Sequence, residues 1–158
     1  MVTFLRKFLG PEDSPYKSKI YMAQPSILYH TQTERACRSY LKSYFVADEI
    51  HTPLDFRKRD LTFFEQLMSE SVAVVGITIE DLYTYPVWQD LERAESLGRP
   101  FFTLQVTKKP GGKDLDFFLI EGMAEFEKLS WEQTKSLYME IQRKQIGVPL
   151  IFGRSSEY

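Results

Sequence analysis

Hydrophobic positions divide this chain into short apolar runs that alternate with stretches of helical period. The apolar runs predict five strands, of which "SVAVVGIT" (residues 71–78) is a nearly continuous apolar run, as expected for a strand covered on both faces. The five predicted strands lie within residues 19–25, 44–53, 71–78, 101–106 and 125–129. A further apolar piece, "DFFLI" (residues 116–120), precedes the last of them and is not assigned to a strand.

Four helices are predicted between and after these strands. Two of them open with a capping box, Thr31 with Glu34 and Ser130 with Gln133. Pro86 suits the first turn of another helix, because the amide of that position has no partner within the helix. The positions expected to face the core are, helix by helix, Cys37, Tyr40, Leu41 and Tyr44; Phe63, Phe64 and Leu67; Val87, Leu91 and Ala94; and Thr134, Leu137, Tyr138 and Ile141.

Strands that alternate with helices favour right-handed crossovers and a parallel sheet. We therefore expect a three-layer α/β/α fold, flavodoxin-like or Rossmann-like, with a parallel five-stranded sheet. In such sheets ligands bind beyond the carboxyl ends of the strands, close to a point where the strand order reverses. This rule brings together three segments that follow strands, residues 23–31, 78–86 and 107–114.

Length and composition agree with one domain over residues 1–158. Of these residues 43% are hydrophobic and 27% are charged, which is enough for a single full core. We expect residues 1–17 to form an N-terminal arm that packs on the body or on a neighbouring subunit, and residues 148–158 to form a C-terminal tail. We also expect the chain to form a homo-oligomer.

The net charge and the cysteine content limit which binding partners and which cellular compartment are expected. The formal net charge is −2 and the signs are mixed along the chain, so duplex nucleic acid is not an expected partner. A single cysteine, Cys37, permits no internal disulfide, which agrees with a cytoplasmic protein. No apolar run approaches the roughly 20 residues that cross a bilayer, so no membrane association is expected.

Several common sites of α/β proteins lack their required residues. Residues 23–31 have no glycine-rich turn for a dinucleotide, and residues 107–114 lack the spacing of a phosphate-binding P-loop. His30 and His51 stand alone, with no Cys/His cluster at the spacing of metal ligands. We therefore expect neither a metal ion nor another cofactor, and a site built on a carboxylate remains.

Asp90 is the candidate carboxylate. When Val87 is placed at zero and each residue advances about 100°, Asp90 lies at about −60°, on the border of the apolar stripe. A carboxylate can attack an anomeric carbon, hold the sugar covalently and release it to water or to another acceptor. Two interpretations stay open, a helix residue paired with Arg93 or another cation, and a carboxylate that faces a ligand.

Polar and aromatic side chains near Asp90 are candidates for holding the sugar and the base of a nucleoside. One group follows the first strand and another lies before or at the start of the helix that carries Asp90. The aromatic members suit a wall for base stacking or a subunit interface. These candidate substrate-binding residues are Gln24, Pro25, Tyr29, His30, Tyr83, Tyr85 and Trp88.

The order of these segments resembles the nucleoside 2-deoxyribosyltransferase family, which includes hydrolases that cleave deoxynucleotide N-glycosidic bonds. "KIYMAQP" is similar to the opening strand of that family, "SVAVVGIT" to its central strand, and "VWQDLERAESLGRPFFTL" to its next helix and strand. The resemblance implies a nucleoside or nucleotide-like substrate and places Asp90 where the family has its glutamate nucleophile. It also implies that Tyr158 corresponds to a C-terminal tyrosine that reaches the substrate in some members.

The chain departs from that family's pattern at its acidic positions. Asp90 is one methylene shorter than glutamate, and a displacement of about 1 Å costs on the order of a hundredfold in rate. An aspartate of the family falls on Phe63 here, with Asp60 one turn earlier, and an acidic residue falls on Ser71. Two functions follow, an enzyme acting on the N-glycosidic bond with Asp90 as nucleophile, or an inactive nucleotide-binding or protein-interaction module of the same fold.

Overall fold

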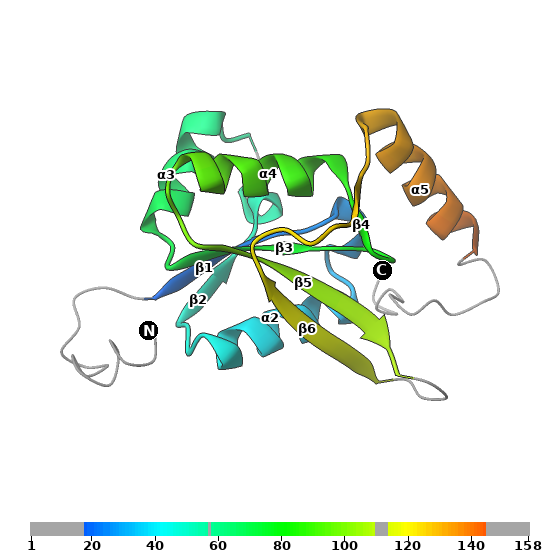
Figure 1. Cartoon of the computed structure of the whole chain (residues 1–158), viewed down its shortest axis with the longest axis horizontal. Helices are drawn as coiled ribbons and strands as arrows, with labels where there is room; N and C mark the ends of the chain where they lie inside the picture. Colours follow the sequence, from blue (N-terminus) through cyan, green and yellow to red (C-terminus); the bar gives the residue numbers. More distant parts are fainter. Residues whose placement is uncertain (1–17, 57, 110–113, 145–158) are drawn as a thin grey trace.

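A computed structural model of the protein describes residues 18–56, 58–109 and 114–144. Five strands form one sheet in the order β2-β1-β3-β5-β6 (Figure 1). Neighbouring strands pair in parallel from β2 to β5, whereas β6 runs antiparallel to β5. The strands are β1 (Lys19–Ala23), β2 (Glu49–His51), β3 (Ala73–Ile77), β5 (Phe101–Lys108) and β6 (Leu115–Glu121). The expected arm and tail, residues 1–17 and 148–158, lie outside the described residues.

Helices cover both faces of this sheet, so the predicted three-layer α/β fold is confirmed. Figure 1 shows α3 and α4 on one face and α2 on the other. The side chains of β1 alternate between the two faces, with Ile20 and Met22 in the core on the α2 side and Tyr21 in the core under α3 and α4. The helices are α2 (Gln32–Tyr44), α3 (Leu61–Glu70), α4 (Tyr85–Ser96) and α5 (Trp131–Lys144), with 3-10 turns η1 (Ser26–Leu28) and η2 (Pro53–Asp55).

The last strand of the sheet differs from the prediction. We expected it in residues 125–129 and parallel, but the apolar piece at residues 116–120 forms β6 instead. Residues 125–129 contain only β7 (Glu127–Lys128), which pairs in parallel with β4 (Leu82–Tyr83) in a separate two-stranded sheet. An antiparallel neighbour needs only a short connection after β5, whereas a parallel one needs a crossover of a dozen residues or more. Proximity along the chain therefore decides the pairing.

Helix α5 lies over the carboxyl ends of the central strands. The Tyr85 amide, at the start of α4, donates to Thr134 Oγ1 at 2.9 Å, and the Ser26 amide, just after β1, donates to Tyr138 Oη at 3.2 Å. Ile141 is buried in the core on the α2 side. None of the helices in the described residues is both long and apolar enough to cross a membrane.

Helices α2 and α4 end in the same backbone geometry with different residues. The position after the C-cap has a positive φ in both, 50° at Val46 and 70° at Gly98. The next amides close matching turns, from Ala47 to the Lys42 carbonyl at 2.9 Å and from Arg99 to the Ala94 carbonyl at 3.0 Å. This left-handed position favours glycine, because a Cβ crowds the following carbonyl oxygen. Val46 therefore stores strain that Gly98 avoids.

We predict that Val46→Gly raises the free energy of unfolding by about 1 kcal/mol, since the strain is released at a residue that is 37% exposed. Gly98→Val is the matched control. A Cβ at Gly98 meets nothing within 4 Å, so the control should lose a similar amount through backbone strain alone. Urea unfolding of both variants measures the two effects. A loss of stability in Val46→Gly would contradict the assignment.

Candidate functional site

The Asp90 side chain points inward between α4 and the sheet. Tyr21 Oη, from β1, donates to Asp90 Oδ2 at 3.0 Å, and Arg93 Nη1, one turn along α4, donates to Oδ1 at 2.8 Å. The Asp90 side chain keeps only 14% of its surface exposed. The structure thus contains the ion pair with Arg93 and, in addition, a contact with the first strand that the helix pattern does not reveal.

Two features of the sheet bring this carboxylate and the first strand together. Tyr21 is fully buried on the α4 side of β1, and a buried phenol needs a hydrogen-bond acceptor. Gly76 of β3, which pairs with Ala23 of β1, allows α4 to lie close to the sheet, because a Cβ there would be 2.7 Å from Cδ1 of Leu91. The small residue in β3 therefore sets the approach of α4, and Asp90 supplies the acceptor.

The environment of Asp90 changes its acidity. Burial raises the pKa of the Asp90 carboxyl to about 6, against the opposing effects of the Tyr21 hydrogen bond and of Arg93. Burial, together with the neighbouring carboxylate, also raises the pKa of the Tyr21 phenol, so this group stays a proton donor in the hydrogen bond. Arg93 makes a longer contact from Nε to Glu65 Oε2 of α3, at 3.9 Å. A buried carboxyl with a perturbed pKa is a recognised mark of a functional group.

The predicted residues after β1 join a polar network between β1, α2 and η2. Gln24 Nε2 donates to Glu34 Oε2 at 2.6 Å and to Thr52 Oγ1 at 3.2 Å, and the His30 amide donates to Glu34 Oε1 at 2.9 Å. Tyr29 Oη donates to Asp55 Oδ1 at 2.9 Å. The structure therefore brings Gln24, Tyr29 and His30 together.

Sequence reasoning missed the charged members of this network. Arg38 Nη2 lies 3.1 Å from Asp55 Oδ2 and 3.4 Å from Glu34 Oε2, and so links the two carboxylates. The spacing of Glu34 and Arg38 by four helical residues was a usable signal. Glu34 was interpreted as a capping residue; its amide does bond to Thr31 Oγ1, at 3.2 Å, while its carboxylate serves the network.

The predicted aromatic residues are used mainly in packing. Tyr83 is fully buried, and its hydroxyl contacts Thr103 Oγ1 at 2.6 Å and accepts the Ala124 amide at 2.6 Å. Trp88 Nε1 donates to the Leu129 carbonyl at 2.8 Å, and its ring lies edge-on to Tyr85 with centroids 5.3 Å apart. These side chains therefore sit in the interior or at the junction of α4 and α5.

Two further positions complete the predicted set. Pro25 is buried, and its carbonyl accepts the Leu28 amide at 3.0 Å, which starts η1. Tyr158 lies outside the described residues. Within the described ranges, no group of three or more His, Cys, Asp or Glu side chains is arranged to hold a metal ion.

The positions at which the resemblance leads us to expect further acids have structural contacts instead. Phe63 packs against Phe56 with ring centroids 5.1 Å apart, and Ser71 Oγ donates to the Leu67 carbonyl at 2.7 Å. Asp60, one turn before Phe63, accepts the Phe63 amide at 3.0 Å and thereby caps α3. These contacts serve the packing and the capping of α3.

Two buried oxygens lie where the strand order reverses. Gln24 follows β1 and Thr78 follows β3, and the chain leaves β1 on one side for β2 and later returns on the other side to β3. Gln24 Oε1 and Thr78 Oγ1 have no hydrogen-bond partner among the described residues. Buried polar atoms are normally satisfied, so these two require water or a ligand. They mark the position at which α/β sheets commonly bind small molecules.

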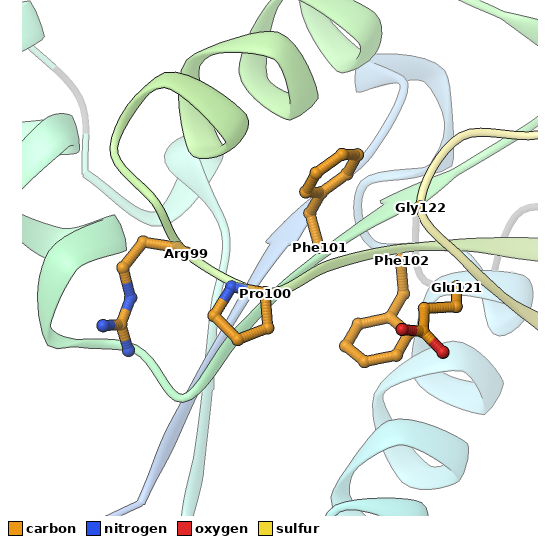
Figure 2. A pocket seen from close by; sticks show the side chains of 6 residues that line it. All are labelled: Arg99, Pro100, Phe101, Phe102, Glu121 and Gly122. Atoms are coloured by element: carbon orange, nitrogen blue, oxygen red, sulfur yellow. The ribbon is translucent and has the colours of Figure 1, made fainter.

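A pocket of about 260 Å³ lies at a different place, beside the start of β5 (Figure 2). Phe101 and Phe102 point to opposite sides of this strand in the figure. The lining residues are Arg99, Pro100, Phe101, Phe102, Glu121 and Gly122. None of the predicted site residues belongs to this lining, so the pocket is separate from the carboxylate site.

We predict that Asp90 makes stability depend on pH. The folded-state pKa of Asp90, about 6, exceeds its unfolded value of about 3.9. Protonation of Asp90 therefore stabilises the folded state fully below about pH 3.9, and this stabilisation is lost as the pH rises through about 6. From pH 4 to pH 7, the unfolding free energy of Asp90→Asn should therefore gain about 2 kcal/mol relative to the wild type.

Urea unfolding at a series of pH values measures this difference. Glu92→Gln, on the exposed side of the same helix, is the matched control and should show no such trend. Parallel pH curves for Asp90→Asn and the wild type would contradict a raised pKa at Asp90.

Comparisons with known proteins leave the family open. No protein-family model matches this chain, and neither a curated protein nor a solved structure matches it. The resemblance to nucleoside 2-deoxyribosyltransferases is therefore a proposal, and function has to be inferred from the residues of the site and their contacts.

Proposed function

We propose that this protein acts on the N-glycosidic bond of a nucleoside or nucleotide, with Asp90 as the nucleophile. The observation that carries the proposal is the contact of Asp90 with Tyr21 and Arg93. Two donors hold one inward carboxylate in a fixed orientation, and each carboxylate oxygen retains a second lone pair for another contact. Preorganisation of this kind is what a nucleophile needs to meet an anomeric carbon.

The proposed reaction has two displacements at the anomeric carbon. A carboxylate oxygen of Asp90 forms a bond to this carbon while the bond to the base breaks, and the base leaves with the electron pair and takes a proton from a nearby polar group. Water or a second base then attacks the same carbon, loses a proton, and releases Asp90 as a carboxylate. Configuration is retained, and the acceptor decides between hydrolysis and transfer. Tyr21 and Arg93 stabilise the carboxylate when it leaves.

The ligand is proposed to be a nucleoside or nucleotide-like molecule with its polar groups near the ends of β1 and β3. Gln24 Oε1 accepts hydrogen bonds and Thr78 Oγ1 both donates and accepts, which suits sugar hydroxyls. We further propose a cytoplasmic homo-oligomer. The single cysteine, Cys37, supports a reducing compartment, since it is buried and free.

A second candidate function is binding without turnover, as a nucleotide-binding or protein-interaction module. It is favoured by the use of Tyr83 and Trp88 in packing contacts rather than in an open wall for a base. Phe63 and Ser71, at positions where the resemblance implies acids, favour it as well. The two candidates differ in whether product forms.

We predict that Asp90→Asn lowers product formation by at least about a thousandfold, because the amide is not a nucleophile. The assay supplies deoxynucleosides and deoxynucleotides with a second free base, and chromatography measures released base and exchanged nucleoside. Glu92→Gln, on the same helix, should retain wild-type rates. Absence of product from the wild type, together with a ligand-induced rise in the unfolding temperature, would reject the enzyme and support the binding module.

We predict that kcat/KM rises with pH through a midpoint of about 6, because the nucleophile must be ionised. Tyr21→Phe should move this midpoint upward, since the Tyr21 hydrogen bond lowers the pKa of Asp90 and its loss leaves the effect of burial less opposed. The pH profiles of the two proteins measure the shift. A midpoint that stays in place or falls in Tyr21→Phe would contradict the proposed role of the hydrogen bond.

A further inference from the structure

The outer edge of β6 is long, apolar and exposed. The sheet has two edge strands, and β2 at the other edge is only three residues long, which limits pairing with another chain. In contrast, β6 has seven residues, with four consecutive apolar residues from Phe117 to Ile120. Phe118 is 55% exposed. Edge strands usually carry charges or bulges that prevent pairing, and the centre of β6 has no charge.

The phase of the β5–β6 ladder shows which backbone groups of β6 face outward. The Lys109 amide donates to the Asp114 carbonyl and the Gly122 amide donates to the Phe101 carbonyl, both at 2.9 Å. Because hydrogen-bonded pairs alternate along an antiparallel ladder, the even-numbered residues of β6 bond to β5. The outward N–H and C=O groups therefore belong to Leu115, Phe117, Leu119 and Glu121. Among the described residues, β5 is the only strand paired with β6.

We propose that β6 pairs antiparallel with β6 of a second copy of this chain, about a two-fold axis at Phe118. In this register Leu115 lies opposite Glu121 and Phe117 lies opposite Leu119. Both are pairs of outward-facing residues, so every free N–H and C=O of the strand finds a partner. The same register aligns all seven residues of both strands. The length of β6 and the phase of its hydrogen bonds therefore favour the same self-complementary register. This pairing joins two five-stranded sheets into one sheet of ten strands.

The charged side chains of β5 and β6 are compatible with this pairing. Glu121 lies opposite Leu115 of the second copy, and Leu115 in turn pairs with Lys108 of its own β5, so Glu121 and Lys108 lie in one row on one face of the sheet. Asp116 lies opposite Ile120, and no carboxylate faces another. Like charges directly opposite would disfavour a pair of strands, and this register avoids them.

The side chains on both faces of β6 are compatible with the proposed pairing. Phe117 and Leu119 already pack against the core on the α2 side, and Phe117 stacks on Tyr40 with ring centroids 4.8 Å apart. Phe118 lies on the opposite face, beside Gln105 of β5. At the proposed axis its exposed ring meets Phe118 of the second copy, and both rings lose contact with water.

A disulfide tests the register. At the axis the two copies of residue 118 form a non-hydrogen-bonded pair, with Cα atoms about 4.5 Å apart, within the range of roughly 4.4–6.8 Å that a disulfide spans. Mild oxidation of Phe118→Cys should therefore give a reducible covalent dimer on a denaturing gel. The wild type should stay monomeric on that gel, since Cys37 is buried. Met139→Cys, at a 69% exposed position of α5, is the matched control and should not cross-link under the same conditions.

The mass in solution tests the interface itself. Light scattering and sedimentation should show a wild-type dimer, and Phe118→Asp should weaken its association at least tenfold, because two carboxylates then meet at the axis. Met139→Asp should leave it unchanged, and circular dichroism establishes that each variant is folded. A wild type that stays monomeric at high micromolar concentration would overturn the proposal. A dimer that neither cross-links through residue 118 nor responds to Phe118→Asp would overturn it too.

Discussion

The contact between Tyr21 and Asp90 is a buried polar interaction that constrains how α4 packs on the sheet. It joins the first strand of the sheet to α4, at 3.0 Å, inside a layer that consists mainly of apolar side chains. Burying a phenol and a carboxylate is costly unless they satisfy each other, so the position of α4 over β1 is set by chemistry as well as by packing. Gly76 makes the approach sterically possible, and Arg93 offsets the charge.

The same contact is what makes Asp90 interesting as a functional group. A carboxylate whose pKa is raised by burial and whose two oxygens are oriented by donors has the properties of a tuned nucleophile. Some of the surrounding residues have polar atoms available for a ligand, and others use their polar atoms in packing contacts. The buried oxygens of Gln24 and Thr78 have no hydrogen-bond partner within the part of the chain that the structure describes, whereas the polar groups of Tyr83 and Trp88 are used in contacts that stabilise the fold. The two proposed functions, catalysis and binding without turnover, therefore differ by a few contacts within one architecture.

The antiparallel strand at the edge adds a separate property to this architecture. Because β6 reverses direction, the sheet ends in a hydrophobic strand whose outward backbone groups match those of an identical strand. This surface lies on the strand farthest from β2 in the sheet, away from the polar network at the ends of β1 and β2. The proposed assembly and the proposed ligand binding can thus be tested separately by substitution.

The sequence by itself determined the three-layer fold, because the alternation of apolar runs with helical periods is local and is found again in strands β1, β2, β3 and β5. It also singled out Asp90, since the edge of an apolar stripe is visible from spacing alone. Only the tertiary structure decided that Tyr21 reaches this carboxylate, that Arg38 links Glu34 to Asp55, and that β6 replaces residues 125–129 in the sheet. These outcomes depend on which distant segments meet, and a one-dimensional pattern does not contain that information.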